Sequence, residues 1–270
     1  HAIFISLGCA LENLVIAAQH SGFKTNITCY TEQAGNESIT VQLTPSPAGE
    51  NGLLFDFIDI RQATRNTYNG KPIPGSEIEK LKATSVQEDV QTILITSEKD
   101  INSIIDLVKE GNRLQFSNSS FITELIKWIR FNKKTAMSAG DGLYGAATGN
   151  PSVPTWFGKL FMKLSANPEK EASKLAELIH SSSAIMIFIA ERNDKKPWIN
   201  VGRSFERTML MATSLNINHA HANMPCEELE VRVKLSRQLN LLKEQQPLLL
   251  IRLGYSEKMP YSFRRPVEDV

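Results

Sequence analysis

The run AIMIFIA at positions 184–190 places seven apolar residues in a row. Such a run, rich in isoleucine, is typical of a strand that is buried on both faces and central in a sheet. Positions 247–253 (PLLLIRL) form a second run of this kind, and the β-branched stretch at 91–96 predicts a third strand. We therefore expect a sheet built around buried strands from the second half of the chain.

Helical periodicity dominates the remaining sequence. Apolar residues recur at helical spacing at 8–22, 76–83, 101–111, 121–131, 156–164, 168–181, 201–215 and 227–241. Residues 53–64 are expected to form a further helix that ends in the cluster RQATR. Residues 25–31 and 39–43 alternate like strands around a turn at 34–36, and 132–154 predicts a loop rich in Gly and small residues. Helices outnumber strands without strict βαβ alternation, so the sequence predicts the α+β class.

The composition excludes several classes of protein. The 270 residues carry 30 Lys and Arg against 29 Asp and Glu, a formal charge of +1, so a strongly electrostatic nucleic-acid or membrane-surface binder is not expected, although a local basic site is. No apolar run approaches the roughly 18–20 residues that span a bilayer, which predicts no membrane span. The three cysteines form no metal-binding pair and are expected to be reduced, in a cytoplasmic protein.

An internal similarity appears when the sequence is shifted by 194 residues. Gly8, Glu12 and Ala18 then fall on Gly202, Glu206 and Ala212, within two apolar helices. A break rich in Pro, Gly and Asn follows at 45–52 and marks a domain boundary. We interpret the pair of helices as the trace of a duplication, with a first unit at 1–48 and a second at 49–270.

Two basic clusters, some 200 residues apart, are the strongest chemical signal. Arg61 and Arg65 lie four residues apart, on one face of the expected helix, and Arg forks suit phosphate and carboxylate groups. The tail Ser262-Phe263-Arg264-Arg265 again offers a hydroxyl and two guanidinium groups. Each cluster alone also fits a solvated helix end or a surface turn, but together the two could converge on one phosphate.

The sequence gives little support for a metal site, a nucleotide-binding loop or a hydrolase active site. His219, His221 and Cys226 suggest a metal site, but further ligands are missing, so we favour a loop that contains two histidines and predict no metal. No GxxxxGK[ST] loop, GxGxxG fingerprint, Gly-x-Ser-x-Gly elbow or His-Glu-x-x-His motif occurs. No side chain stands out as an acid–base catalyst.

These features together resemble a known family. Residues 60–68 (IRQATRNTY) resemble the R-R-x-x-R-x-F/Y opening of nitroreductase-like flavoproteins. Residues 198–212 resemble that family's long core helix, and 253–255 with 259–270 resemble its last strand and phosphate-binding tail. The helix at 121–131 with Asp141-Gly142-Leu143 resembles the Acg-like branch, in which two nitroreductase halves are fused in one chain.

The resemblance implies a nitroreductase-like α+β fold with a central, mainly antiparallel sheet flanked by helices in three layers, and FMN held where two halves meet. Residues 1–48 would be the end of a truncated first half, and 49–270 a second half that carries the FMN phosphate site. Arg61 and Arg264 would bind the phosphate with help from Ser262, Arg65 would approach the pyrimidine edge of the flavin, and Gln62 would bind the ring or the ribityl chain. The FMN-binding residues implied are Arg61, Gln62, Ala63, Arg65, Asn223, Met224, Ser262, Arg264 and Arg265.

The implied activity is that of a bacterial FMN-dependent oxidoreductase, in which electrons pass from NAD(P)H through the flavin to a nitroaromatic, a quinone or a similar small acceptor. The flavin would carry the chemistry, so no catalytic side chain is expected. The sequence departs from the family's pattern at two points: Ala63 stands where members of the family commonly carry Ser, and the family's early H-N-x-Q-P-W segment is absent. The alternatives are a protein that sequesters FMN beneath a lid at 132–154 and a structural protein that has lost flavin. The fused halves would form a pseudo-dimer, and homodimerisation stays open.

Overall fold

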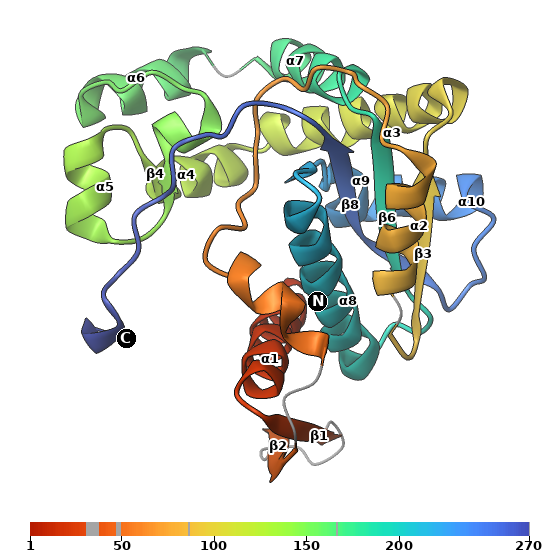
Figure 1. Ribbon diagram of the computed structural model, residues 1–270. Helices are drawn as coiled ribbons and strands as arrows, with labels where there is room; N and C mark the ends of the chain where they lie inside the picture. The colour runs from red at the N-terminus through yellow and green to blue at the C-terminus, as the bar shows by residue number, and fades with distance from the viewer. Residues whose placement is uncertain (31–37, 47–49, 86, 166, 270) are drawn as a thin grey trace.

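A four-stranded antiparallel sheet lies at the centre of the computed structural model (Figure 1). The structure describes residues 1–30, 38–46, 50–85, 87–165 and 167–269. The strand order is β3 (Val90–Ile95), β6 (Ala184–Ala190), β8 (Gln246–Gly254) and β7 (Asn218–His221). Every neighbouring pair in this sheet is antiparallel, and the two apolar runs form its inner strands. The α+β prediction, with a mainly antiparallel central sheet, is therefore confirmed.

Helices cover both faces of this sheet, because the side chains of β6 alternate between two cores. Ala184, Met186, Phe188 and Ala190 pack with side chains of α1 (Ala2–His20), α2 (Gly75–Thr84) and α8 (Lys195–Ser214). The three isoleucines between them pack against α3 (Glu98–Ser117), α7 (Pro168–His180), α9 (Met224–Glu227) and α10 (Leu229–Gln238). The predicted three-layer arrangement is confirmed.

A separate group of helices stands beside this body (Figure 1). We call residues 119–165 the helical lobe: α4 (Ser119–Trp128), β4 (Ile129–Arg130), α5 (Lys133–Ala139), β5 (Leu143–Tyr144), η2 (Gly145–Thr148) and α6 (Thr155–Ser165). The prediction of a loop over 132–154 is wrong, since α5 occupies part of it. The Asn132 side chain accepts a hydrogen bond from the Thr135 amide at 3.0 Å and caps this helix, and Gly140, with φ 61°, ends it.

The expected helix at 53–64 is also only partly present. A 3-10 helix, η1 (Glu50–Phe57), is followed by a turn and then by irregular backbone that carries RQATR. The Thr64 amide donates a hydrogen bond to the His219 carbonyl at 2.8 Å, and Ala63 forms an isolated parallel bridge with His219. Pairing with the exposed edge of the sheet thus replaces the last helical turn. The predicted loop around His219 and His221 is likewise wrong, because both histidines lie on β7.

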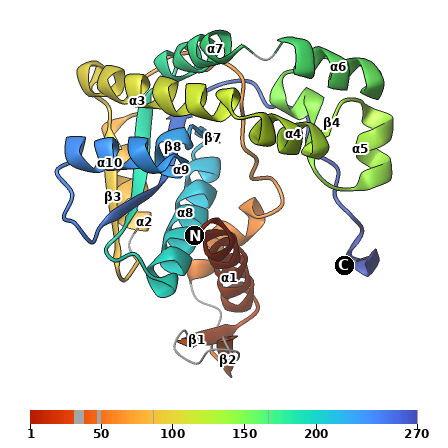
Figure 2. The same cartoon turned by 180° about the vertical axis from the view of Figure 1, so that it is seen from behind.

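The two helices of the internal similarity pack directly on one another (Figure 2). A Cβ atom on Gly202 would lie 2.0 Å from the Ile5 carbonyl oxygen, and one on Gly8 would lie 2.0 Å from the Ile199 carbonyl oxygen. Both pairs are related by the same shift of 194 residues, so α1 and α8 cross about a local two-fold relationship. Only glycine allows this close approach of the two backbones.

The elements after these helices also correspond. α1 leads into β1 (Phe23–Tyr30), which pairs antiparallel with β2 (Ser38–Pro45), just as α8 leads into β7, which pairs antiparallel with β8. The predicted turn at 34–36 lies outside the described residues.

α1 is long and apolar enough to cross a membrane by length and composition, contrary to the expectation from apolar runs alone. Its polar contacts, however, belong to a packed helix. Glu12 is fully buried and forms ion pairs with Arg203, at 2.9 Å, and with Arg207. A buried carboxylate held by two guanidinium groups, together with the glycine contact, fastens α1 to α8.

Candidate anion-binding site

The segment after η1 brings its arginines to the edge of the central sheet. The charges of Arg61 and Arg65 both act on His219 and His221 of β7, so the two guanidinium groups lie in one region although the segment is not helical. The Arg61 Nε donates to Oε1 of Glu206 at 2.9 Å, and its Nη1 lies 3.4 Å from Nε2 of His219. The Arg61 side chain keeps 25% of its surface exposed, whereas that of Glu206 keeps 1%. Arg61 is therefore anchored at one edge and accessible at the other.

Two polar atoms around Arg61 lack a partner. Glu206 Oε2 and His219 Nδ1 are both buried and make no hydrogen bond to any residue that the structure describes. An unpaired buried polar atom costs about 1–3 kcal/mol. Burial and the charge of Arg61 lower the pKa of His219 well below its ordinary value of 6.5, so this ring is neutral.

Arg65 is a half-buried cation without an anionic partner. Among the described residues it forms neither an ion pair nor a hydrogen bond. Burial lowers its pKa, as expected for a charge that has lost water without gaining a counter-ion. The titratable groups with which its charge interacts include Tyr68, a second arginine, Arg252, and the two histidines of β7. This part of the site is thus suited to an anion.

Arg252 supports the segment from beneath. It is buried on β8, 4.0 Å from the centre of the Tyr68 ring, and donates to the carbonyl oxygens of Asn66 at 2.9 Å and Thr64 at 3.4 Å. The Tyr68 hydroxyl donates back to the Thr64 carbonyl at 2.9 Å. Together these contacts hold Arg65 in place, between two hydrogen-bonded backbone groups.

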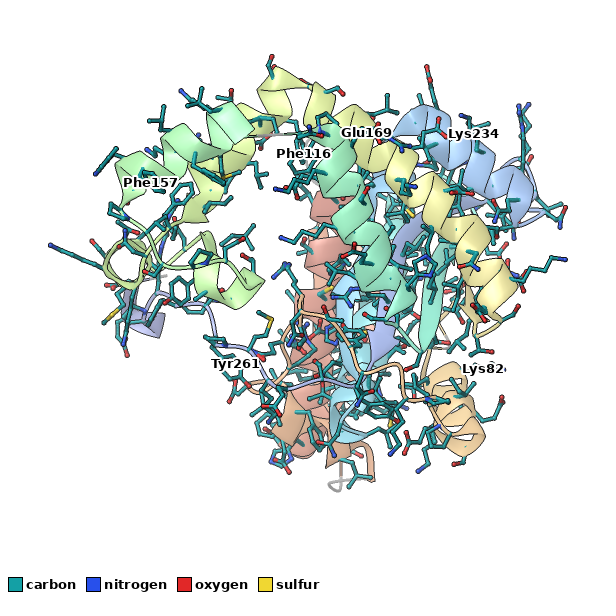
Figure 3. The ribbon with its side chains drawn as sticks, turned by 90° about the horizontal axis from the view of Figure 1, so that it is seen from above. Lys82, Phe116, Phe157, Glu169, Lys234 and Tyr261 are labelled. Carbon is teal, nitrogen blue, oxygen red and sulfur yellow. The ribbon has the colours of Figure 1, made fainter. Side chains whose placement is uncertain are left out.

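The C-terminal tail lies along the same segment. Gln62 donates to the Met259 carbonyl at 3.0 Å and accepts from the Met259 amide at 3.3 Å, so its amide pairs with both backbone groups of one residue. The Tyr261 hydroxyl donates to the Ile60 carbonyl at 2.8 Å. Figure 3 shows Tyr261 where the tail passes from the main body towards the helical lobe. The arginine segment therefore lies beside residues 259–261, which directly precede the basic end of the tail.

Beyond Tyr261 the tail turns to the helical lobe. The rings of Phe263 and Tyr144 lie 5.5 Å apart, and Arg265 donates to Asp141 at 3.3 Å. Arg264 is exposed and donates to the Phe263 carbonyl, while Ser262 is half-buried. No contact among the described residues joins Arg264 to Arg61. A phosphate shared by these two arginines stays a prediction.

The remaining predicted residues lie farther along the sheet. Asn223 accepts from the Leu250 amide at 2.9 Å and donates to Glu227 at 3.2 Å, so its side chain is engaged within the protein. Met224 begins α9 and packs against Gly111 of α3, where a Cβ atom on Gly111 would lie 2.9 Å from the Met224 Cβ. The carbonyl oxygens of Asn223 and Met224 accept hydrogen bonds from the amides of residues 226–228, so these backbone groups are also engaged within the protein.

Sequence reasoning missed the supporting role of three residues. Glu206 anchors Arg61, His219 lies beneath the same guanidinium, and Arg252 carries the backbone of 64–66. The available signals were a single acid inside an apolar helix and a single arginine inside the run PLLLIRL. No group of three metal-ligating side chains occurs in the described parts of the chain.

Comparison with known proteins gives distant likenesses only. No protein-family model matches the sequence, and no curated protein matches it. Solved structures that resemble it include a nitroreductase-like family protein from Bacillus cereus, with 12% identity over 80% of this chain and 92% of that chain at a TM-score of 0.48. A nitroreductase with bound FMN from Bacteroides fragilis has 14% identity over 80% and 94%, at 0.46. Oxidized iodotyrosine deiodinase bound to FMN and 3-iodo-L-tyrosine has 10% identity over 79% and 95%, at 0.49.

Each of these identities is below 20% and each TM-score is below 0.5. The function of this chain depends on its own residues, because one fold can carry many activities.

Proposed function

We propose that this chain binds FMN and acts as an oxidoreductase that passes electrons from NAD(P)H to a nitroaromatic, a quinone or a similar small acceptor. The observation that carries the proposal is Arg65, a half-buried guanidinium with no anionic partner among the described residues, close to Arg61 and the C-terminal tail. Such a cation is stabilised by an anion supplied from outside the protein.

The residues fit the anionic parts of FMN. Arg61 keeps part of its guanidinium accessible and would bind the phosphate together with Arg264 and Ser262. Arg65 would stabilise negative charge at the pyrimidine edge of the ring. Gln62 holds the tail against the arginine segment rather than leaving its amide free.

Ala63, Arg265 and the backbone of Asn223 and Met224 complete the proposed site. FMN, when bound, supplies the two-electron chemistry, and the protein binds and orients it.

We further propose that residues 1–48 are the end of a first nitroreductase-like half and that 49–270 form the second. The reciprocal contacts of Gly8 with Ile199 and of Gly202 with Ile5 support this division, since both obey one shift of 194 residues. The chain would then be a pseudo-dimer of the Acg-like kind, of cytoplasmic and bacterial character, in which FMN lies where the halves meet.

A second candidate function is sequestration of FMN with little or no turnover. It is favoured by the contacts of the tail with the helical lobe, Phe263 with Tyr144 and Arg265 with Asp141. These contacts tie the basic tail to a lobe that could restrict the access of NAD(P)H.

The experiment is a spectroscopic titration of the purified protein. Bound flavin that NADPH or NADH bleaches supports the enzyme, and bound flavin that neither bleaches supports sequestration. Arg65→Ala and Arg61→Ala should each weaken FMN binding by about 1.5–3 kcal/mol, roughly ten- to a hundredfold. Riboflavin, which lacks the phosphate, separates the two roles: Arg61→Ala should leave riboflavin binding almost unchanged, whereas Arg65→Ala should weaken both ligands.

Arg113→Ala is the matched control, because Arg113 is an exposed arginine of α3 that pairs with Glu169 at 2.6 Å. It should bind FMN like the wild type. A colourless protein that also ignores added FMN, or wild-type FMN affinity in both arginine variants, would refute the proposed site.

A further inference from the structure

The outer face of α6 carries a row of exposed apolar side chains. Trp156, Leu160 and Leu164 follow one another at intervals of four residues and are 70%, 49% and 77% exposed. Phe157 and Phe161 form the adjacent row, with ring centres 6.3 Å apart, and are 46% and 58% exposed. Figure 3 shows Phe157 on the helical lobe, away from the central sheet.

The packing of α6 determines that this face points outwards. Gly158 is buried, and a Cβ atom there would lie 2.2 Å from the Phe131 ring. The helix therefore presses its glycine against the lobe, and a residue two positions away, such as Trp156 or Leu160, is turned by roughly 160° from it. The row of Trp156, Leu160 and Leu164 is consequently the side farthest from the lobe interior, and Phe157 and Phe161 lie on the flank between that row and the lobe.

Lysines border the apolar rows. Lys159 and Lys163 lie one turn apart on the flank of α6 next to Trp156, and both are exposed. The lobe as a whole has six Lys and Arg against two Asp and Glu, and Asp141 is neutralised by Arg130 and Arg265. None of the five lysines of the lobe pairs with a carboxylate in the parts of the chain that the structure describes.

The same lobe contains a basic hollow beside α6. It has a volume of about 390 Å³ and contains Lys127, Lys134 and Lys159 in its lining. Thr135 and Thr155 also line it; the Thr135 hydroxyl donates to the Asn132 carbonyl, whereas the Thr155 hydroxyl accepts from the Asn132 side-chain amide and keeps its own proton to donate. Ammonium groups and hydroxyls around an open hollow suit a phosphate ester.

We propose that the helical lobe docks on an anionic phospholipid surface, with the apolar rows of α6 in the interfacial layer and the lysines on the lipid phosphates. A helix with Trp, Phe and Leu on one side and lysines on its border has the composition of an interfacial helix. Long lysine side chains reach from the apolar layer to the headgroups.

The size of the patch favours lipid over a second protein chain. The exposed parts of the five apolar side chains amount to on the order of 500 Å², whereas a stable protein interface buries about 800 Å² on each partner. A single convex helix with lysines along its border matches a layer of negative headgroups better than another copy of this basic lobe.

The test is co-sedimentation of the full chain with vesicles. We expect binding to vesicles of about 70% phosphatidylcholine and about 30% phosphatidylglycerol, weak binding to phosphatidylcholine alone, and loss of binding in about 0.5 M NaCl. Leu160→Glu with Leu164→Glu should lower the partition coefficient at least about tenfold. Lys159→Glu with Lys163→Glu should lower it by a similar factor, since each lysine near an anionic surface is worth about 1 kcal/mol, or roughly fivefold.

The control pairs are Leu229→Glu with Leu242→Glu and Lys80→Glu with Lys243→Glu, which change equally exposed residues outside the lobe. Both controls should bind like the wild type, and circular dichroism should show that all variants are folded. The proposal is overturned if no anionic vesicle binds the protein or if the lobe and control pairs behave alike. It is also overturned if light scattering finds a dimer that Leu160→Glu with Leu164→Glu dissociates while lipid binding is absent.

Discussion

The contact between α1 and α8 allows a sharp prediction about stability. Gly202→Ala places a methyl group 2.0 Å from the Ile5 carbonyl oxygen, against an ordinary contact of at least 3.4 Å. The two helices have to separate by more than 1 Å to relieve this overlap, which would stretch the ion pairs of Glu12 with Arg203 and Arg207. Overpacking of a core costs about 1–3 kcal/mol and sometimes more.

The better helix propensity of alanine returns up to about 1 kcal/mol, so we expect a net loss of about 1–2 kcal/mol in the free energy of unfolding. For a chain of this length this loss lowers the melting temperature by about 2–8 °C. Gly8→Ala should cost a similar amount, because its methyl group would lie 2.0 Å from the Ile199 carbonyl oxygen. The double variant should lose at least about 1 kcal/mol less than the sum of the single variants, since one separation of the helices relieves both clashes.

Urea and thermal unfolding followed by circular dichroism measure these differences. Gly75→Ala, at the start of α2, is the control, because no heavy atom lies within 4 Å of its added Cβ. It should unfold within about 0.5 kcal/mol of the wild type. Wild-type stability in Gly8→Ala and Gly202→Ala would refute the close crossing of α1 and α8, and with it the main structural support for two related halves.

Two further predictions concern the buried groups around Arg61. Below about pH 6.5 the unfolded chain binds a proton at His219, whereas the folded protein does not, because the pKa of the buried ring is lowered. Unfolding therefore takes up a proton, and the free energy of unfolding should fall as the pH is lowered, by up to about 1.4 kcal/mol per pH unit. In His219→Gln this contribution should vanish from urea unfolding curves recorded between pH 5 and pH 7; an unchanged slope would show that His219 is not buried. Glu206→Ala should lower the free energy of unfolding by about 1–3 kcal/mol, because Arg61 would lose its only carboxylate partner among the described residues but could regain water through its exposed edge. Glu206→Gln, which retains a hydrogen-bond acceptor but not the charge, should lose less in the same assay, and equal losses in the two variants would show that the hydrogen bond without the charge contributes nothing.

Much of the core could be predicted from local sequence patterns. The runs at 184–190 and 247–253 are apolar at nearly every position, and a strand of that composition is stable only where both faces are covered. The amphipathic helices α3 and α7 could be predicted in the same way, from a stripe of apolar residues at helical spacing.

The predictions from sequence were wrong where contacts with distant parts of the chain override the conformation that neighbouring residues favour. Residues 61–65 have helical neighbours and a helical charge spacing, yet their backbone pairs with β7, which lies more than 150 residues away. In 132–154, glycines and small residues predicted a loop, but Asn132 and Gly140 instead begin and end α5.

The sequence by itself determined the α+β class, the buried strands and the two glycine-bearing helices, because burial periodicity is a property of neighbouring residues. It also placed arginines in two separate segments. Only the tertiary structure decided that Gln62 holds the C-terminal tail through Met259, that Glu206 and His219 lie beneath Arg61, and that Arg65 is left without a counter-ion in the described protein. Those relations depend on side chains brought together from three different elements, and no local pattern encodes the distance between them.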